Sequence, residues 1–358
     1  MNSTQNDEEP KKKVRDANIE LLRIFSMLFI VIYHFFIYSI QPNNQDLWFV
    51  TNPIIAVLHI GVINFILISG YYGIKFSLEG FLKLIIKCSA YSILIYIAYI
   101  FPNPQFFSIK ELIRSTIPIQ WWFINIYLCL FLLTPIINIP IKKASTEKKL
   151  IFIFILFIVS FCFQFCPSLS DGKNCVNFIL IYYIGNFTRH NLKIINNMNI
   201  INCLSIYILF NIFIVALYLL LSYTKFYGEL MFSLIFPYNS IGLIINSLLF
   251  ANIFNNLNIK SQIINYLSVS ILPIYLITEN NYIGIYLYKF ANNMKNYTDS
   301  PVFYGASWLL LVASICIVCI IVDKIINPLL KTVENSIFET QLFKRVNNKV
   351  NIILNNQS

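Results

Sequence analysis

The chain has 358 residues, of which 58% are hydrophobic and only 12% charged, and its mean hydropathy is +0.68. Soluble domains carry roughly 25% charged residues, so this composition excludes a single water-soluble core and predicts a membrane protein. The net charge of +10 does not indicate nucleic-acid binding, because the basic residues form short clusters between apolar runs and no continuous basic stripe.

Long apolar runs follow one another along the chain, separated by charged residues, Pro or Asn, and most approach the roughly 20 residues that a helix needs to cross a bilayer. They predict an all-α, polytopic transmembrane helical bundle of about ten spans. In chain order the predicted spans are residues 19–40, 53–72, 80–101, 120–140, 150–166, 175–188, 200–222, 231–251, 263–288 and 303–328.

The ends of the chain are more polar than the apolar runs. The first run is too long for a signal-peptide core, so we expect the N-terminus to be kept. The predicted organisation is a basic cytoplasmic segment at 1–14, one transmembrane domain at 15–330 and a polar cytoplasmic tail at 331–358. We expect the tail to form a surface helix followed by a frayed end.

Lys and Arg are concentrated in alternate connections between the predicted spans. With the N-terminus inside, cytoplasmic connections hold clusters such as Lys75 with Lys83 and Lys87. The outer connections then hold only Lys110, Arg114, Lys173, Lys225, Lys289 and Lys295. Basic residues of short loops are retained in the cytoplasm, so the pattern predicts an even number of spans with both termini cytoplasmic.

The first predicted span carries three ionisable residues, Glu20, Arg23 and His34. A helix turns 100° per residue, so the eleven steps from Arg23 to His34 return to within about 20° of the same face, over a rise of roughly 16 Å. Glu20 lies about one turn before Arg23. The simpler interpretation is that Glu20 and Arg23 pair at the interface while His34 bonds a neighbouring helix. Because ionisable groups inside a bilayer are costly, three on one face favour a functional site.

Two further ionisable residues lie in predicted spans. His59, near the outer start of the second span, either lines the same outer vestibule as His34 or caps backbone at the interface. Glu279 belongs to a polar patch that runs from Thr278 to Asn281. It is either a substrate contact or counter-charge for a histidine, or part of a re-entrant turn after a ninth span that ends early.

Two other sequence features have simpler explanations. Trp121 and Trp122 open the fourth span on the expected outer side, where an aromatic belt places tryptophan, although the same rings suit stacking on a sugar. Cys316 and Cys319 are spaced like zinc ligands but lack a second pair, so no metal site is predicted.

Three motifs, in order, resemble the membrane-bound acyltransferase 3 family. Ile19-Glu20-Leu21-Leu22-Arg23 followed by His34 is similar to its first-helix signature, commonly Leu-Asp-x-Leu-Arg and then a histidine. The run from Phe65 to Tyr71, which contains Ser69-Gly70, resembles the family's Phe-x-Leu-Ser-Gly-Phe segment, and Trp122-Phe123 with Tyr127 resembles its Trp-Phe-Leu segment.

The chain also departs from the family's pattern. Glu20 replaces the usual Asp, Lys83 and Lys87 stand where the family has an arginine pair, and Thr278 occupies a position where related sequences often carry His.

The resemblance implies an enzyme that transfers an acyl group other than an amino-acyl group. The donor would be cytoplasmic acyl-CoA, usually acetyl-CoA, and the acceptor a hydroxyl of a cell-surface glycan or its lipid-linked precursor, with no bound cofactor. The setting would be the bacterial cytoplasmic membrane, as a multi-pass protein with lipid, acyl-CoA and glycan as partners and no nucleic acid. His34 would be the general base, either directly or through a transient acyl-histidine.

The resemblance and the charge pattern together assign the remaining candidate residues. Glu20 would orient Arg23, and Arg23, Lys83 and Lys87 would bind the CoA phosphates. The expected substrate contacts are Ser69, Trp122, Tyr127, Glu279 and His59. A transporter or flippase for a lipid-linked sugar or small solute is the alternative, although no paired broken helices are evident, and a non-catalytic partner in glycan assembly is a third.

Overall fold

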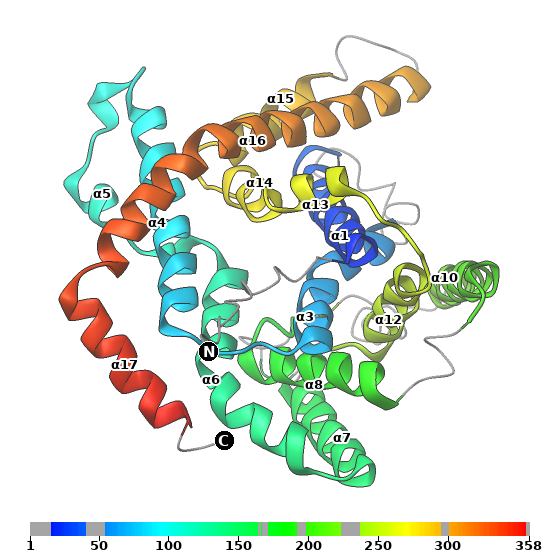
Figure 1. Ribbon diagram of the computed structural model, residues 1–358. Helices are drawn as coiled ribbons and strands as arrows, with labels where there is room; N and C mark the ends of the chain where they lie inside the picture. The colour runs from blue at the N-terminus through cyan, green and yellow to red at the C-terminus, as the bar shows by residue number, and fades with distance from the viewer. Residues whose placement is uncertain are drawn as a thin grey trace, which may run out of the picture.

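A computed structural model describes residues 16–40, 54–163, 166, 171–191, 198–222, 237–294 and 301–355, and within them it contains helices and turns but no strand (Figure 1). The predicted segment 1–14 lies outside the described residues. The helices are α1 (Ala17–Phe35), η1 (Phe36–Ile40), α3 (Ile60–Tyr72), α4 (Leu78–Ile100), η4 (Pro104–Phe106), α5 (Ile109–Ser115), η5 (Pro118–Gln120), α6 (Trp122–Lys143), α7 (Thr146–Cys162), α8 (Cys175–Asn191), α10 (Ile200–Ser222), α12 (Ile241–Asn255), α13 (Gln262–Ser268), α14 (Ile271–Thr278), α15 (Gly284–Asn293), α16 (Pro301–Phe338) and α17 (Gln341–Asn355).

The all-helical prediction is confirmed for the described residues, and six helices are long and apolar enough to cross a membrane. They cover Ala17–Ser39, Ile54–Tyr72, Leu78–Ile100, Trp122–Lys143, Ile200–Leu220 and Phe303–Phe338. Three other predicted spans correspond to helices of 17, 17 and 15 residues, α7, α8 and α12. The predicted count of about ten spans stays a prediction.

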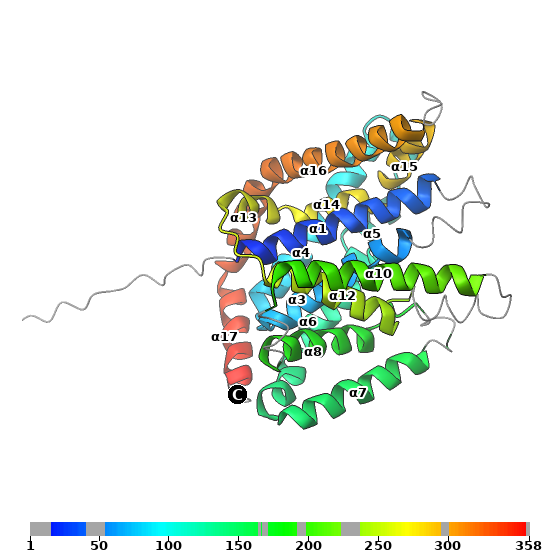
Figure 2. The same ribbon diagram turned by 90° about the vertical axis from the view of Figure 1, so that its right-hand side faces the viewer.

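The predicted ninth span is not one helix. It is divided into α13, α14 and α15, and α14 ends at Thr278 with Glu279 as its C-cap. Beyond it, α16 continues to Phe338, so the predicted start of the polar tail at 331 falls inside a helix. The expected surface helix of the tail is α17, which lies across one end of the bundle (Figure 2).

Side-chain contacts join the start of α1 to the ends of α3 and α8 at one end of the bundle. The hydroxyl of Tyr72, at the end of α3, donates to Asp16 at 2.7 Å, and Arg189, at the end of α8, donates to the Tyr71 carbonyl at 2.8 Å. In Figure 2 the start of α1 and the whole of α17 lie at this same end. We call it the N-terminal end of the bundle.

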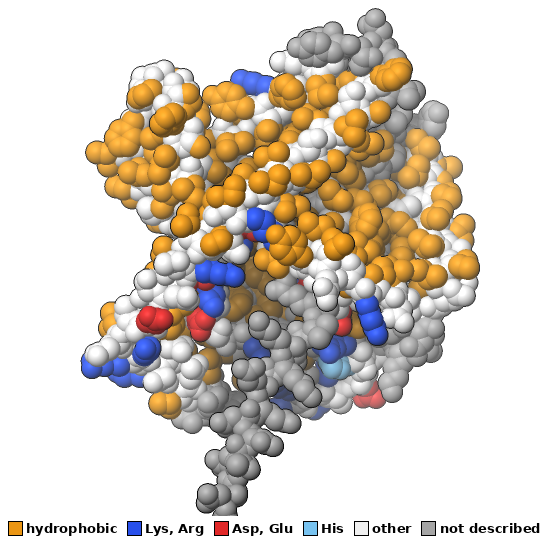
Figure 3. Space-filling model, turned by 45° about the horizontal axis from the view of Figure 1, so that its top comes forward, with side chains coloured by type: hydrophobic (Ala, Val, Ile, Leu, Met, Phe, Trp, Pro, Cys, Tyr) orange, Lys and Arg blue, Asp and Glu red, His pale blue; other side chains and the backbone are white. Residues whose placement is uncertain are grey.

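The outer surface of the bundle is largely apolar. Exposed Ile, Leu, Phe and Val side chains cover the outward faces of α7, α10 and α16, and Figure 3 shows hydrophobic side chains over much of one face while the visible charged groups gather mostly toward its lower part. Helices satisfy their backbone hydrogen bonds internally, so such faces are stable against lipid. The chain is an integral membrane protein.

Helix α3 forms the core and packs closely on α8. A Cβ added at Gly70 would lie 2.0 Å from the Tyr182 carbonyl oxygen, and one added at Gly185 would lie 2.3 Å from that of Leu67. Only glycine permits both approaches, which is the small-residue packing typical of membrane helices. This contact fixes the side of α3 that carries Ser69 and faces α6.

Candidate active site

A cavity of about 190 Å³ follows α1 between the helices of the core. Four residues of α1 line it at helical spacing: Arg23, Met27, Ile30 and His34. The remaining walls come from α3, α4, α6 and α14, through Val62, Phe65, Ser69, Leu84, Trp122, Phe123, Ile124, Tyr127, Ile271, Leu272 and Tyr275. The structure therefore brings Arg23, His34, Ser69, Trp122 and Tyr127 to one cavity.

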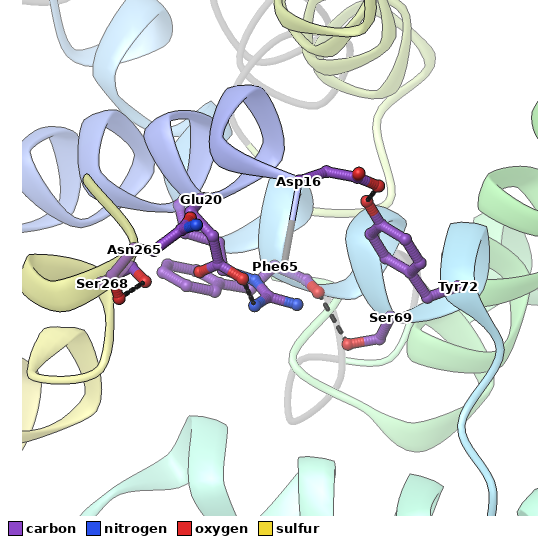
Figure 4. Close-up of polar contacts among 8 residues, drawn as sticks. Asp16, Glu20, Phe65, Ser69, Tyr72, Asn265 and Ser268 are labelled. Atoms are coloured by element: carbon purple, nitrogen blue, oxygen red, sulfur yellow. Dashed lines mark hydrogen bonds and ion pairs between the residues drawn. The ribbon is translucent and has the colours of Figure 1, made fainter. Parts of the chain in front are cut away.

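Arg23 lies toward the N-terminal end of this cavity. Its Nη1 atom is 2.7 Å from Oε1 of Glu20, which is itself buried, and Figure 4 shows Glu20 near the start of α1 with Ser69 and Tyr72 of α3 nearby. The ion pair with Glu20 orients the guanidinium, and because the Arg23 side chain is 33% exposed, the group is still accessible. Such a group suits binding of a phosphate or carboxylate.

His34 lies further along the cavity and contacts two acceptors through one ring nitrogen. Its Nδ1 atom is 2.9 Å from the Ile30 carbonyl oxygen and 3.1 Å from Oε1 of Glu279. A carbonyl oxygen only accepts hydrogen bonds, so Nδ1 carries the proton and Nε2 keeps a free lone pair. The Tyr288 hydroxyl donates to the same Glu279 oxygen at 2.8 Å, which fixes the carboxylate.

The break in the predicted ninth span explains how Glu279 reaches His34. Because α14 ends at Thr278, the chain turns at Glu279 and returns through α15, which supplies Tyr288. Parts of both interpretations made from the sequence apply to Glu279: the helix ends at Thr278, and the carboxyl group lies 3.1 Å from a histidine. Glu279 is not among the residues that line the cavity, so its expected role as a substrate contact stays a prediction. A histidine oriented by a buried carboxylate is the usual arrangement of a general base.

Three expected substrate contacts line the opposite wall. The Ser69 hydroxyl donates to the Phe65 carbonyl at 2.8 Å and lies 3.2 Å from the Tyr127 hydroxyl. Trp122 lies near the expected outer end, with the Lys173 ammonium 5.5 Å from its ring. These residues offer two hydroxyls and an aromatic surface along the path between Arg23 and His34.

His59 does not line this cavity. Its ring stacks on Tyr33 at 4.7 Å between centroids and packs against Tyr238 at 4.3 Å. Tyr33 precedes His34 in α1, so His59 supports the helix that carries His34. Its expected role as a substrate contact stays a prediction.

The two lysines expected to bind CoA also lie outside the cavity lining. Lys83 pairs with Glu79 at 2.5 Å on the exposed face of α4. Lys87 lies 3.4 Å from Oδ1 of Asp323, and the same oxygen accepts a hydrogen bond from Tyr91 at 2.8 Å. The other carboxylate oxygen, Oδ2, accepts one from Ser270 at 2.6 Å. This buried cluster joins α4 and α16 to the turn before α14.

Sequence reasoning overlooked Asp323, although an acid within the apolar run at 303–328 was a sufficient signal, since such a group requires a partner. Tyr288 gave no comparable signal, because nothing in the sequence distinguishes it from the many other tyrosines.

Comparison with known proteins adds to this geometry. No curated protein and no solved structure matches the chain. A family described as an acyltransferase domain does match, over residues 16–324, a range that contains the cavity, His34, Glu279 and Asp323. The first-helix, Ser-Gly and Trp-Phe motifs that resemble the family each contribute residues to the wall of the cavity. The chain therefore belongs to the acyltransferase 3 family.

Proposed function

We propose that the protein transfers an acetyl group from cytoplasmic acetyl-CoA to a hydroxyl of a cell-surface glycan or its lipid-linked precursor. The single observation that carries the proposal is His34, oriented by Glu279, in the wall of a cavity that also contains Arg23. The family supports acyl transfer by a membrane protein; the donor, the acceptor and a bacterial cytoplasmic membrane are our proposals.

Arg23 is the proposed contact for the CoA phosphates. It is accessible, oriented by Glu20, and lies at the end of the bundle that the charge pattern assigns to the cytoplasm. The separation of Arg23 and His34 along α1, about 16 Å, is close to the length of an extended pantetheine arm. Lys83 and Lys87 would add weaker attraction, because each already faces a carboxylate.

The proposed reaction is a proton-coupled acyl transfer. Nε2 of His34 takes the proton of the acceptor hydroxyl while that oxygen attacks the thioester carbonyl carbon. The tetrahedral intermediate collapses, the carbon–sulfur bond breaks, and the CoA thiolate takes the proton back from the imidazolium. Glu279 stabilises the imidazolium through Nδ1, as a buried carboxylate does beside a catalytic histidine.

The experiment uses purified protein in lipid nanodiscs with labelled acetyl-CoA and cell-surface polysaccharide. We expect label in the polysaccharide with the wild-type protein and its loss in His34→Ala. His190→Gln is the matched control, because His190 lies at the end of α8 outside the cavity. A transporter would consume no acetyl-CoA, so the wild-type reaction separates the two functions.

A further inference from the structure

A second cavity, of about 400 Å³, lies between the last turns of α4, the connection to α6 and the turn that follows α14. Tyr99, Tyr282 and Tyr286 line it together with Glu111, Arg114 and Lys289. In Figure 2, α5 and α15, which contribute to its walls, lie in the half of the bundle away from the N-terminal end. None of these six residues lines the cavity that contains Arg23 and His34.

The lining combines aromatic rings with hydrogen-bonding groups. The Tyr99 ring lies 4.9 Å from that of Tyr282 and 6.4 Å from that of Tyr286, between ring centroids. Tyrosines offer an apolar face and a polar tip, and pockets of this kind hold a ligand by its faces while a few polar groups set its orientation. A sugar ring, with apolar C–H faces and equatorial hydroxyls, matches such a wall.

The charges of the lining favour an anionic ligand. Glu111 is already engaged: Tyr282 donates to its Oε2 at 2.9 Å, and Arg114 Nη1 lies 3.8 Å from its Oε1. Within the described part of the chain, no ion pair is formed by Lys289. One carboxylate and two cations leave the cavity with one net positive charge.

Arg114 and Lys289 also lie in predicted outer loops, where basic residues are unusual. Basic residues are disfavoured in short outer loops. Six are predicted there, and of the four that are described, Lys110, Arg114, Lys173 and Lys289, two line this cavity. A ligand for Arg114 and Lys289 would explain why basic residues stand in these loops.

The same turn of chain joins this cavity to His34. Tyr282 follows Glu279 by three residues, so their Cα atoms lie within about 11 Å. Tyr286 precedes Tyr288, which donates to Glu279, by two residues. A ligand between Tyr282 and Tyr286 is therefore held by the turn that orients the histidine.

Resting on the proposed acyl transfer, we infer that this cavity binds the acceptor, as a sugar that carries an anionic group. Arg114 and Lys289 hold that group, and the tyrosines hold the ring with a hydroxyl directed toward His34. The anion is a carboxylate of an acidic sugar in the glycan or a phosphate of the lipid-linked precursor, and the same two cations serve either.

The test uses the full-length protein in lipid nanodiscs with three probes: a disaccharide containing glucuronic acid, its all-glucose counterpart, and glucose 1-phosphate. Arg114→Gln and Lys289→Gln are compared with Lys110→Gln, which removes a charge from the exposed face of α5 outside the cavity. Kd is measured without acetyl-CoA, and acceptor KM at saturating acetyl-CoA. Thermal melting confirms that each variant is folded.

We expect both cavity variants to raise Kd and acceptor KM for the preferred anionic probe about tenfold, the effect of losing one charge-assisted hydrogen bond. The KM for acetyl-CoA stays unchanged, and Lys110→Gln behaves as wild type. Preference for the glucuronic acid probe identifies the glycan as the source of the anion, and preference for glucose 1-phosphate identifies the precursor.

Two results would overturn the inference: equal binding of the all-glucose disaccharide by the wild type, or cavity variants that match Lys110→Gln. If the latter occurs while the wild type transfers acetyl groups, the proposed function stands without this cavity. If the wild type transfers none but binds anionic probes through Arg114, the proposed function fails and the cavity is still a site for acidic sugars.

Discussion

Replacing Glu279 with glutamine removes the ionisable carboxyl group beside His34 and keeps an acceptor oxygen on a side chain of nearly the same size. The carboxylate lies 3.1 Å from Nδ1 and is held by Tyr288, so glutamine can keep the neutral contacts. A hydrogen bond to a charged group contributes about 1.5–3 kcal/mol. If that contribution acts on the imidazolium formed during transfer, kcat falls by about 10- to 160-fold.

The assay is single-turnover and steady-state acetyl transfer by purified protein, with Glu147→Gln, an exposed acid at the start of α7, as the matched control. We expect kcat to fall in Glu279→Gln while the KM for acetyl-CoA is unchanged. His34→Ala should lose more, and adding Glu279→Gln to it should cost nothing further, because both residues act in one step. An additive loss, or a Glu279→Gln enzyme as fast as Glu147→Gln, would show that Glu279 does not act through His34.

Three further predictions concern other parts of the molecule. Arg23→Gln should raise the KM for acetyl-CoA by about tenfold or more with little change in acceptor KM, as measured by acetyl-transfer kinetics. Asp323→Ala should destabilise the protein by about 3–5 kcal/mol, seen as a lower melting temperature in detergent, because it leaves the largely buried Lys87 without its counter-charge. The pKa of His190 lies below its usual value because of partial burial and the positive charges of Arg189 and Lys149; His190 is therefore neutral above about pH 6.5, and His190→Gln should leave any break of the pH–rate profile above that pH unchanged.

Relationships within one helix could be predicted from the sequence, and those between distant segments could not. The spacing of Arg23 and His34 places both on one face of α1 by helix geometry alone, and both line the same cavity. The contact between His34 and Glu279 joins residues 245 apart in number, and sequence could only offer it as one of two interpretations.

A hydropathy pattern also could not predict where the helices end. The run at 263–288 is apolar over most of its length, yet the helix breaks near Ser270 and again at Glu279. The Ser270 hydroxyl donates to Asp323, and the Glu279 carboxyl group contacts His34. Such breaks depend on partners in other helices, so a one-dimensional pattern predicts a single span. The Ser69-Gly70 motif was identified by resemblance alone, and the structure gives a physical reason for it. Ser69 lines the cavity, and Gly70 allows the close approach of α8.

Transfer of an acyl group by His34 onto a surface glycan can be tested by mass analysis of surface glycans from cells that produce the wild-type chain, His34→Ala or neither. We expect glycan species heavier by an acetyl group only with the wild-type chain, at equal levels of the two proteins in the membrane. Glycans that carry the same acyl mass in His34→Ala cells, or that do not differ between cells with and without the protein, would contradict it.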